Sequence, residues 1–198
     1  SSFLQRTYDQ ISQDICINQN AVTIAVYTAS VYGMNDVTHL GIYDIPMISN
    51  IPNLVYLAPV TAEDYFAMLD WSLEQTEHPV AIRVPIQYIS DGKPVTKNFG
   101  DLNRYEMTQE GSEIAIVALG SFYPLGVAAA EKIAQKTGIT PTLINPYYIT
   151  GLDTDCLEQL KKNHRVVLTL EDGVLDGGFG EKIARFYGDS KVRTKCFG

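Results

Sequence analysis

The spacing of apolar residues changes repeatedly along the first half of this 198-residue chain. Three short, continuous β-rich runs are typical of strands covered on both faces: residues 22–27, 54–57 and 80–84. Between the last two runs, apolar residues recur at helical spacing after Thr61, which can form a variant of the capping box with Asp64. That helix is expected to end near residues 77–79. The order strand, helix, strand predicts a parallel sheet with a right-handed crossover.

Helical spacing also occurs before the first strand, where residues 3–18 carry one stripe formed by Leu4, Tyr8, Ile11 and Ile15. The second half of the chain repeats the alternation. Strands are expected at residues 113–119, 141–145, 165–170 and 192–196, and helices at residues 125–136, 153–161 and 179–186. Turn-forming residues dominate positions 86–111, which we interpret as a linker with short edge strands. The pattern predicts an α/β protein of two three-layer units with mainly parallel sheets, at residues 1–85 and 112–198.

Composition narrows the classes of partner. The net charge is −8, and Arg6 is the only base before residue 83, so nucleic acid and anionic membranes are not expected as partners. No apolar run approaches membrane-spanning length and no leader opens the sequence, which favours a soluble, cytoplasmic protein. The three cysteines lie far apart without His at ligand spacing, and no metal site is expected within the chain.

The segment Thr38-His39-Leu40-Gly41 places a histidine in a loop between two predicted strands. Loops at the carboxyl ends of such strands are where open α/β sheets meet ligands, and imidazole exchanges protons near neutral pH. A solvated or hydrogen-bonded structural histidine is the alternative. His78 and His164 are expected to be solvated turn residues.

Three further features are interpreted structurally. The glycine-rich run 176–181 follows a strand like a phosphate loop, but it lacks the third glycine of the dinucleotide fingerprint, so we expect close helix packing. Glu171 and Asp172 are adjacent carboxylates, which we expect at a domain or subunit contact. Trp71 belongs to the predicted amphipathic helix.

Short motifs across nearly the whole chain occur in an order that resembles the transketolase group of thiamine diphosphate enzymes, most closely the 1-deoxy-D-xylulose-5-phosphate synthases. In the first half they lie at residues 3–10, 38–41, 51–53, 58–59 and 79–83. In the second half they lie at residues 120–121, 151–153, 170–172 and 177–180. The resemblance identifies residues 1–85 as a partial pyrimidine-binding domain, residues 86–111 as a linker and residues 112–198 as a transketolase C-terminal domain.

The resemblance implies a site that this chain shares with another domain. In such enzymes a diphosphate-binding domain holds Mg and the diphosphate, and the pyrimidine domain holds the aminopyrimidine, usually across two protomers. The residues that it implies are His39 for catalysis, Phe3 and Arg6 for the cofactor, and Asn35, Asp36 and Arg83 for the substrate. For Arg6, a structural ion pair with Asp9 or Asp14 is the alternative.

Two departures from the synthase pattern concern the acceptor. Thr28 and Ile86 stand where the synthases have arginines that hold the acceptor's phosphate. Each missing charge-assisted contact is worth roughly 1.5–3 kcal/mol, so an altered acceptor is expected. Compensation by Arg83, by Lys93 or by an N-terminal part outside the chain is the alternative.

The cofactor-activating glutamate and the diphosphate motif of the family are not in this sequence. We therefore expect a part of a longer homodimeric enzyme, inactive alone, that uses thiamine diphosphate and Mg. Its expected substrates are a ketone or 2-oxo acid donor and an aldehyde acceptor, such as pyruvate and glyceraldehyde 3-phosphate in the synthase reaction. A pyrimidine and C-terminal subunit of a split transketolase or 2-oxo-acid dehydrogenase is one alternative. A catalytically silent interaction domain is the other.

Overall fold

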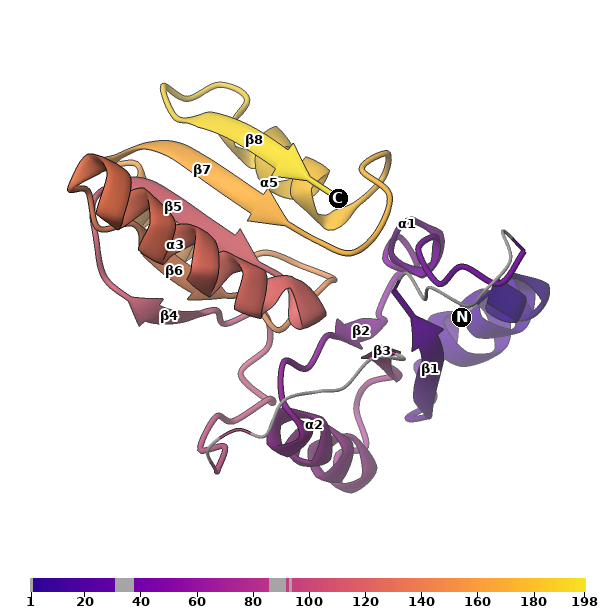
Figure 1. The fold of residues 1–198 in the computed structure, drawn as a ribbon. Helices are drawn as coiled ribbons and strands as arrows, with labels where there is room; N and C mark the ends of the chain where they lie inside the picture. The colour runs from indigo at the N-terminus through magenta and orange to yellow at the C-terminus, as the bar shows by residue number, and fades with distance from the viewer. Residues whose placement is uncertain (1, 31–37, 86–91, 93) are drawn as a thin grey trace.

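The structure, a computed structural model, describes residues 2–30, 38–85, 92 and 94–198, and contains two sheets flanked by helices (Figure 1). The three-stranded sheet of the first unit has the order β1-β3-β2, and the five-stranded sheet of the second unit has the order β4-β6-β5-β7-β8. Among the strands of the described residues, every pairing is parallel except that of β4 with β6. The mixed α/β architecture with mainly parallel sheets confirms the predicted fold class.

The first sheet contains the three strands that the β-rich runs predict. They are β1 (Thr23–Ala29), β2 (Val55–Leu57) and β3 (Val80–Pro85). Helix α2 (Ala62–Glu74) connects β2 to β3, and the predicted capping box is present: Thr61 Oγ1 accepts from the Asp64 N–H at 3.1 Å. The helix ends at Glu74, before the predicted end, because the Gln75 side chain closes a turn by accepting from the N–H groups of residues 77 and 78.

The N-terminal segment is helical but not a regular α-helix. It forms a 3₁₀-helix η1 (Ser2–Thr7) and a π-helix η2 (Gln10–Ile17), which bury Ile11 and Cys16. Apolar spacing does not separate these helix types from an α-helix, so the predicted single helix is wrong in detail. A five-residue helix, α1 (Asp44–Ile48), was not predicted and buries Asp44, Ile45 and Ile48.

The second sheet is built from five strands. They are β4 (Glu106–Gln109), β5 (Glu113–Ala118), β6 (Thr142–Asn145), β7 (His164–Leu170) and β8 (Arg193–Phe197). Its helices are the 3₁₀ turn η3 (Gly120–Phe122), α3 (Tyr123–Thr137), α4 (Thr154–Leu160) and α5 (Phe179–Tyr187). Alternate residues of β5 face different cores: Ile116 packs with Ala130 of α3, while Val117 packs with Ile183 of α5. The helices therefore cover both faces, as Figure 1 shows.

His164 corrects one expectation. The residue begins β7 and is buried instead of lying in a solvated turn. Its Nε2 lies 2.8 Å from Thr142 Oγ1, and its Nδ1 lies 3.2 Å from the Leu160 carbonyl oxygen. Both ring nitrogens find partners inside the protein, which explains how a polar ring is accommodated there. Burial lowers the pKa of His164.

The two units share one hydrophobic core. Its buried members include Tyr56 and Ile45 of the first unit and Ile144 and Phe179 of the second. Main-chain bonds cross the boundary as well, because the N–H of Ile149 donates to the carbonyl of Tyr56 at 2.7 Å. Within the part of the chain that the structure describes, no helix is both long and apolar enough to span a membrane.

Candidate functional site

The His39 loop lies beyond the carboxyl end of β1. Just past that strand, the Ser30 N–H donates to the Gly41 carbonyl at 2.7 Å, and the Gly41 N–H donates back at 3.3 Å. This short antiparallel bridge fixes the end of the loop against the sheet. Because ligands of open parallel sheets bind at the carboxyl ends of strands, the loop occupies the position where chemistry is expected.

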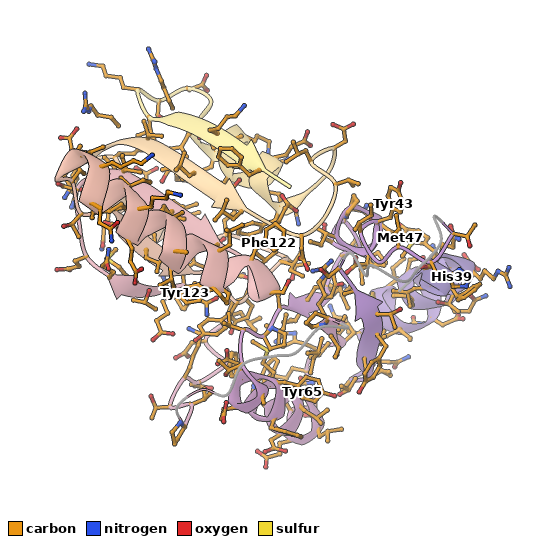
Figure 2. The ribbon with its side chains drawn as sticks, in the orientation of Figure 1. His39, Tyr43, Met47, Tyr65, Phe122 and Tyr123 are labelled. Atoms are coloured by element: carbon orange, nitrogen blue, oxygen red, sulfur yellow. The ribbon has the colours of Figure 1, made fainter. Side chains whose placement is uncertain are left out.

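Phe3, Arg6 and His39 are brought together on one face. The rings of Phe3 and His39 meet edge to face, with centroids 5.3 Å apart and planes at 74°. The Arg6 guanidinium carbon lies 5.4 Å from the centroid of the Phe3 ring. Ser2 Oγ donates to the carbonyl of Leu40 at 3.3 Å, so η1 is tied directly to the loop. In Figure 2, His39 lies at the edge of the first unit, away from Phe122 and Tyr123 of the second.

The chemistry of these three residues can be compared with the cofactor-binding and catalytic roles that the resemblance implies for them. Phe3 is 57% exposed and offers a flat apolar surface to a heteroaromatic ring. Imidazole and guanidinium groups beside that ring can donate hydrogen bonds to polar atoms at the ring's edge. Thr38 Oγ1 lies 2.8 Å from His39 Nδ1 and orients the imidazole. Among the described residues, no group of three or more His, Cys, Asp or Glu side chains is placed to hold a metal ion.

Asn35 and Asp36, which the resemblance implies for the substrate, lie outside the described residues, as do Ile86 and Lys93. Arg83 is described, and its setting differs from a substrate-binding arginine. It is 2% exposed; Nε donates to Asp44 at 2.7 Å, Nη1 donates to Asp172, and Nη2 donates to the Gly41 carbonyl at 3.1 Å. The donors of Arg83 thus serve contacts within the protein, and this geometry does not support contact with a substrate.

The carboxylates around Arg83 form a buried network. Asp44 also accepts from the Tyr56 hydroxyl, and Asp172 accepts from Ser121 Oγ. Burial opposes the charge on Arg83, but Asp44 and Asp172 raise its pKa above the ordinary value, which keeps the guanidinium charged. Burial, together with Asp44, raises the pKa of Tyr56 and keeps its hydroxyl a donor.

Sequence reasoning missed this network, although one signal was present. Arg83 interrupts the apolar run of β3, and a charge in a strand covered on both faces requires a partner. The expected domain contact of the adjacent carboxylates is confirmed for Asp172, which joins the loop after β7 to Arg83 of the first unit, whereas the Glu171 carboxylate bonds within the second unit.

Glu171 has different hydrogen-bond partners from Asp172. Its carboxylate accepts from the N–H groups of Phe179 at 2.8 Å and Gly180 at 2.7 Å, at the start of α5. These are the donors that a phosphate would use at a helix N-terminus. A Cβ at Gly180 would collide with Thr169 Oγ1 and lie 3.0 Å from Cys196 Cβ. The glycine-rich run therefore serves close helix packing, as predicted.

A groove of about 790 Å³ lies elsewhere, between the start of α2, residues 94–97 and β4. Its polar groups bond to one another: the Tyr147 hydroxyl donates to Glu106 at 2.6 Å, and the Tyr123 hydroxyl donates to Thr108 at 2.6 Å. Phe3, Arg6 and His39 are not among its lining residues. The chemistry implied by these three residues therefore belongs to the exposed face and not to the groove.

Comparison with solved structures agrees with this fold. A structure described as a split-gene transketolase, an inactive beta4 tetramer, superposes with a TM-score of 0.82 at 23% identity and covers 98% of this chain and 63% of that one. The transketolase of Pichia stipitis in complex with sedoheptulose-7-phosphate gives a TM-score of 0.74 at 16% identity, covering 100% of this chain and 28% of that one.

Sequence relatives are more similar. The 1-deoxy-D-xylulose-5-phosphate synthase of Clostridium perfringens is 35% identical over 203 residues, and that of Pelotomaculum thermopropionicum is 36% identical over 203 residues. Both alignments cover 100% of this chain but only 32% and 31% of the relatives, so the chain spans about a third of their length. Residues 1–90 match the transketolase pyrimidine binding domain, and residues 103–196 match the transketolase C-terminal domain. The chain therefore belongs to the transketolase family, with a pyrimidine-binding domain followed by a C-terminal domain similar to those of 1-deoxy-D-xylulose-5-phosphate synthases.

Proposed function

We propose that this chain contributes the pyrimidine-binding side of the active site in a thiamine diphosphate-dependent carboligase similar to 1-deoxy-D-xylulose-5-phosphate synthase. The observation that carries the proposal is the contact of Phe3 with both Arg6 and His39 on an exposed face beyond the first sheet. The donor is a ketone or a 2-oxo acid such as pyruvate, and the acceptor is an aldehyde. The similarity to the synthases over the whole chain supports this reaction class.

Each residue of the face has a distinct task. The cofactor, when bound, supplies a nucleophilic carbon for addition to the donor's carbonyl. Phe3 packs against the aminopyrimidine, and Arg6 adds positive charge beside that ring. His39 moves a proton at a carbonyl oxygen of the substrate, because an imidazole ring can both donate and accept a proton.

The acceptor is the part of the proposal that differs from the synthases. Arg6 and Arg83 are the two bases of residues 1–85, and Arg83 is held inside the protein by Asp44 and Asp172. Thr28, in place of a family arginine, has φ +56°, which places a β-branched residue in a strained backbone conformation. Little positive charge is therefore available in this unit for a phosphate, and we assign an aldehyde acceptor without one.

Magnesium and the diphosphate would be held by a diphosphate-binding domain, either on the same polypeptide or on a partner subunit. A homodimer with shared sites is the arrangement we propose. The likeness to the split-gene transketolase favours a second arrangement, in which the diphosphate domain is a separate chain. Purification of the native protein, followed by mass spectrometry of its subunits, distinguishes the two arrangements.

Kinetics of the complete protein test the function. With Mg, thiamine diphosphate and pyruvate, we expect Mg-dependent cofactor binding by calorimetry and a higher kcat/KM for glyceraldehyde than for glyceraldehyde 3-phosphate. A preference for the phosphorylated aldehyde would refute the altered acceptor but keep the carboligase. Absence of cofactor binding would instead support a catalytically silent interaction domain.

A further inference from the structure

The loop containing His39 is held from two sides. On one side is the bridge between Ser30 and Gly41 within the first unit. On the other side, Arg83 Nη2 donates to the Gly41 carbonyl at 3.1 Å, and the N–H of Val174 donates to the carbonyl of Ile42 at 3.2 Å. Val174 belongs to the second unit, so the position of this loop depends on contacts across the boundary between the units.

The bond between Arg83 and Asp172 is the charged part of this boundary. The side chains of Arg83, Asp44 and Asp172 are 3%, 0% and 1% exposed. One guanidinium serves two carboxylates. Asp44 Oδ2 accepts from both Arg83 Nε and the Tyr56 hydroxyl, and the second oxygen of Asp172 accepts from the Ser121 hydroxyl. Hydrogen bonds between such buried charges are strong and directional, because little water competes for them. A shift of Asp172 would therefore shift Arg83 and the Gly41 carbonyl with it.

Close packing reinforces the bond. A Cβ at Gly173 would lie 3.3 Å from the Ile42 carbonyl oxygen, and a Cβ at Gly177 would lie 3.0 Å from Pro46 Cβ. The loop after β7 thus lies directly against residues 42–46. Its far end is fixed by Glu171, which accepts hydrogen bonds at the start of α5. The loop after β7 is therefore held by its own unit as well as by its contacts with residues 42–46.

We propose that Arg83 and Asp172 are positioning residues, through which the C-terminal unit holds residues 38–44 and hence the imidazole of His39. This gives the C-terminal unit a role in the site without any contact between it and the substrate. The role of His39 in turnover rests on the proposed function; the restraint on the loop does not.

The variant Asp172→Asn tests the proposal with limited risk to folding. It removes one of two carboxylates and leaves Arg83 paired one-to-one with Asp44. The matched control is Asp176→Asn, the same change on an exposed residue of the same loop. Hydrogen–deuterium exchange of the complete protein, followed by mass spectrometry, gives separate rates for residues 39–44 and for β5 and β7.

In Asp172→Asn we expect exchange of residues 39–44 to accelerate at least about tenfold, with β5 and β7 unchanged and the control like wild type. Equal rates for residues 39–44 in Asp172→Asn and wild type would overturn the proposal. Acceleration of all three regions together would also overturn it, because that result shows a general loss of stability. If Asp172→Asn does not fold, Ser121→Ala removes one bond to Asp172 and should give a smaller acceleration confined to the same loop. No acceleration in that variant would then overturn the proposal.

Activity separates this inference from the proposed function. If the restraint positions His39, Asp172→Asn lowers kcat while the KM for the donor stays within about twofold of wild type. If the loop loosens but His39→Ala retains full turnover, the restraint stands and the assigned role of His39 fails. If His39→Ala loses turnover while Asp172→Asn changes neither exchange nor kcat, the positioning role fails and the proposed function stands.

Discussion

The ring of Phe3 contacts the ring of His39 edge-on, with centroids 5.3 Å apart, although one residue precedes β1 and the other follows it. The contact joins the N-terminal 3₁₀-helix to the loop beyond the first sheet. Phe3 nevertheless remains 57% exposed, so the contact with His39 buries only part of this apolar residue. An exposed apolar surface of this kind can bind a flat ligand or pack against a neighbouring subunit.

Replacement of Phe3 by Ala should weaken Mg-dependent binding of thiamine diphosphate about tenfold or more, because an apolar stacking surface is lost. The melting temperature should hardly change, since the ring is largely exposed. Phe66→Ala is the matched control, because Phe66 is 60% exposed on α2. Calorimetric titration of the complete protein measures both variants. Unchanged affinity in Phe3→Ala would remove Phe3 from the cofactor site.

The buried network predicts a large effect on stability. In Arg83→Leu, Asp44 and Asp172 would lose their shared cation while still buried, and the free energy of unfolding should fall by about 3–5 kcal/mol. Arg104 is exposed and pairs with the exposed Asp155 and with the buried Asp153. Asp153 also accepts from the N–H groups of residues 105 and 156, so Arg104→Leu should change stability much less. Denaturation in urea measures both variants. Equal losses of unfolding free energy in the two variants would show that the buried ion pairs of Arg83 stabilise the fold no more than those of Arg104.

Two buried threonines should respond in opposite directions to replacement by Val. Thr169 Oγ1 is buried and has no hydrogen-bond partner in the described part of the protein, so Thr169→Val should stabilise by up to about 1 kcal/mol. Thr142 Oγ1 lies 2.8 Å from His164 Nε2 and accepts from the Gly111 N–H at 3.0 Å. Thr142→Val should therefore destabilise by about 1–3 kcal/mol, since it leaves buried groups unpaired. Destabilisation by Thr169→Val would indicate a partner for that hydroxyl.

His164 makes stability depend on pH. Burial lowers the pKa of His164, and the hydrogen bond to Leu160 and the charge of Glu113 only partly offset this. The unfolded chain therefore takes up a proton near pH 6.5 that the folded chain resists. The stability that the neutral, buried His164 contributes to the folded protein is fully present above about pH 6.5 and is lost as pH falls below it.

In His164→Gln, the fall in unfolding free energy between about pH 6.5 and pH 5 should be shallower than in wild type. His78→Gln is the control, because His78 lies half-buried in a turn beside Glu77. Denaturant titrations at several pH values provide the slopes. A slope in His164→Gln equal to that of wild type would assign the pH dependence to other groups.

Much of the fold could be predicted because its strands and longer helices carry local signals. The capping box of Thr61 and the apolar runs of β1, β3 and β7 are examples. The short helix α1 was missed because five residues that include Pro46 show no period. Strand β4 is a short edge strand of the kind expected in the turn-rich segment, but its antiparallel pairing with β6 carries no local signal.

The candidate site could likewise be predicted only in part. The motifs around Phe3 and His39 marked residues that the fold brings into contact. The partners of Arg83 come from α1 and from the loop after β7, and the sequence around Arg83 holds no local trace of them. Local patterns predict which elements form and which residues can do chemistry. They do not predict which distant carboxylates neutralise a buried charge, because that pairing arises from packing of the two units.

The turnover of His39→Ala in the complete protein, with pyruvate and an aldehyde, tests the central claim most directly. We predict that kcat falls by about 100-fold or more, while the melting temperature stays close to that of wild type because His39 lies in a loop outside the core. His78→Ala should retain wild-type kcat. If His39→Ala instead loses several degrees of melting temperature and keeps full activity per folded molecule, His39 is a structural residue. The exposed face that it forms with Phe3 is then not part of the active site.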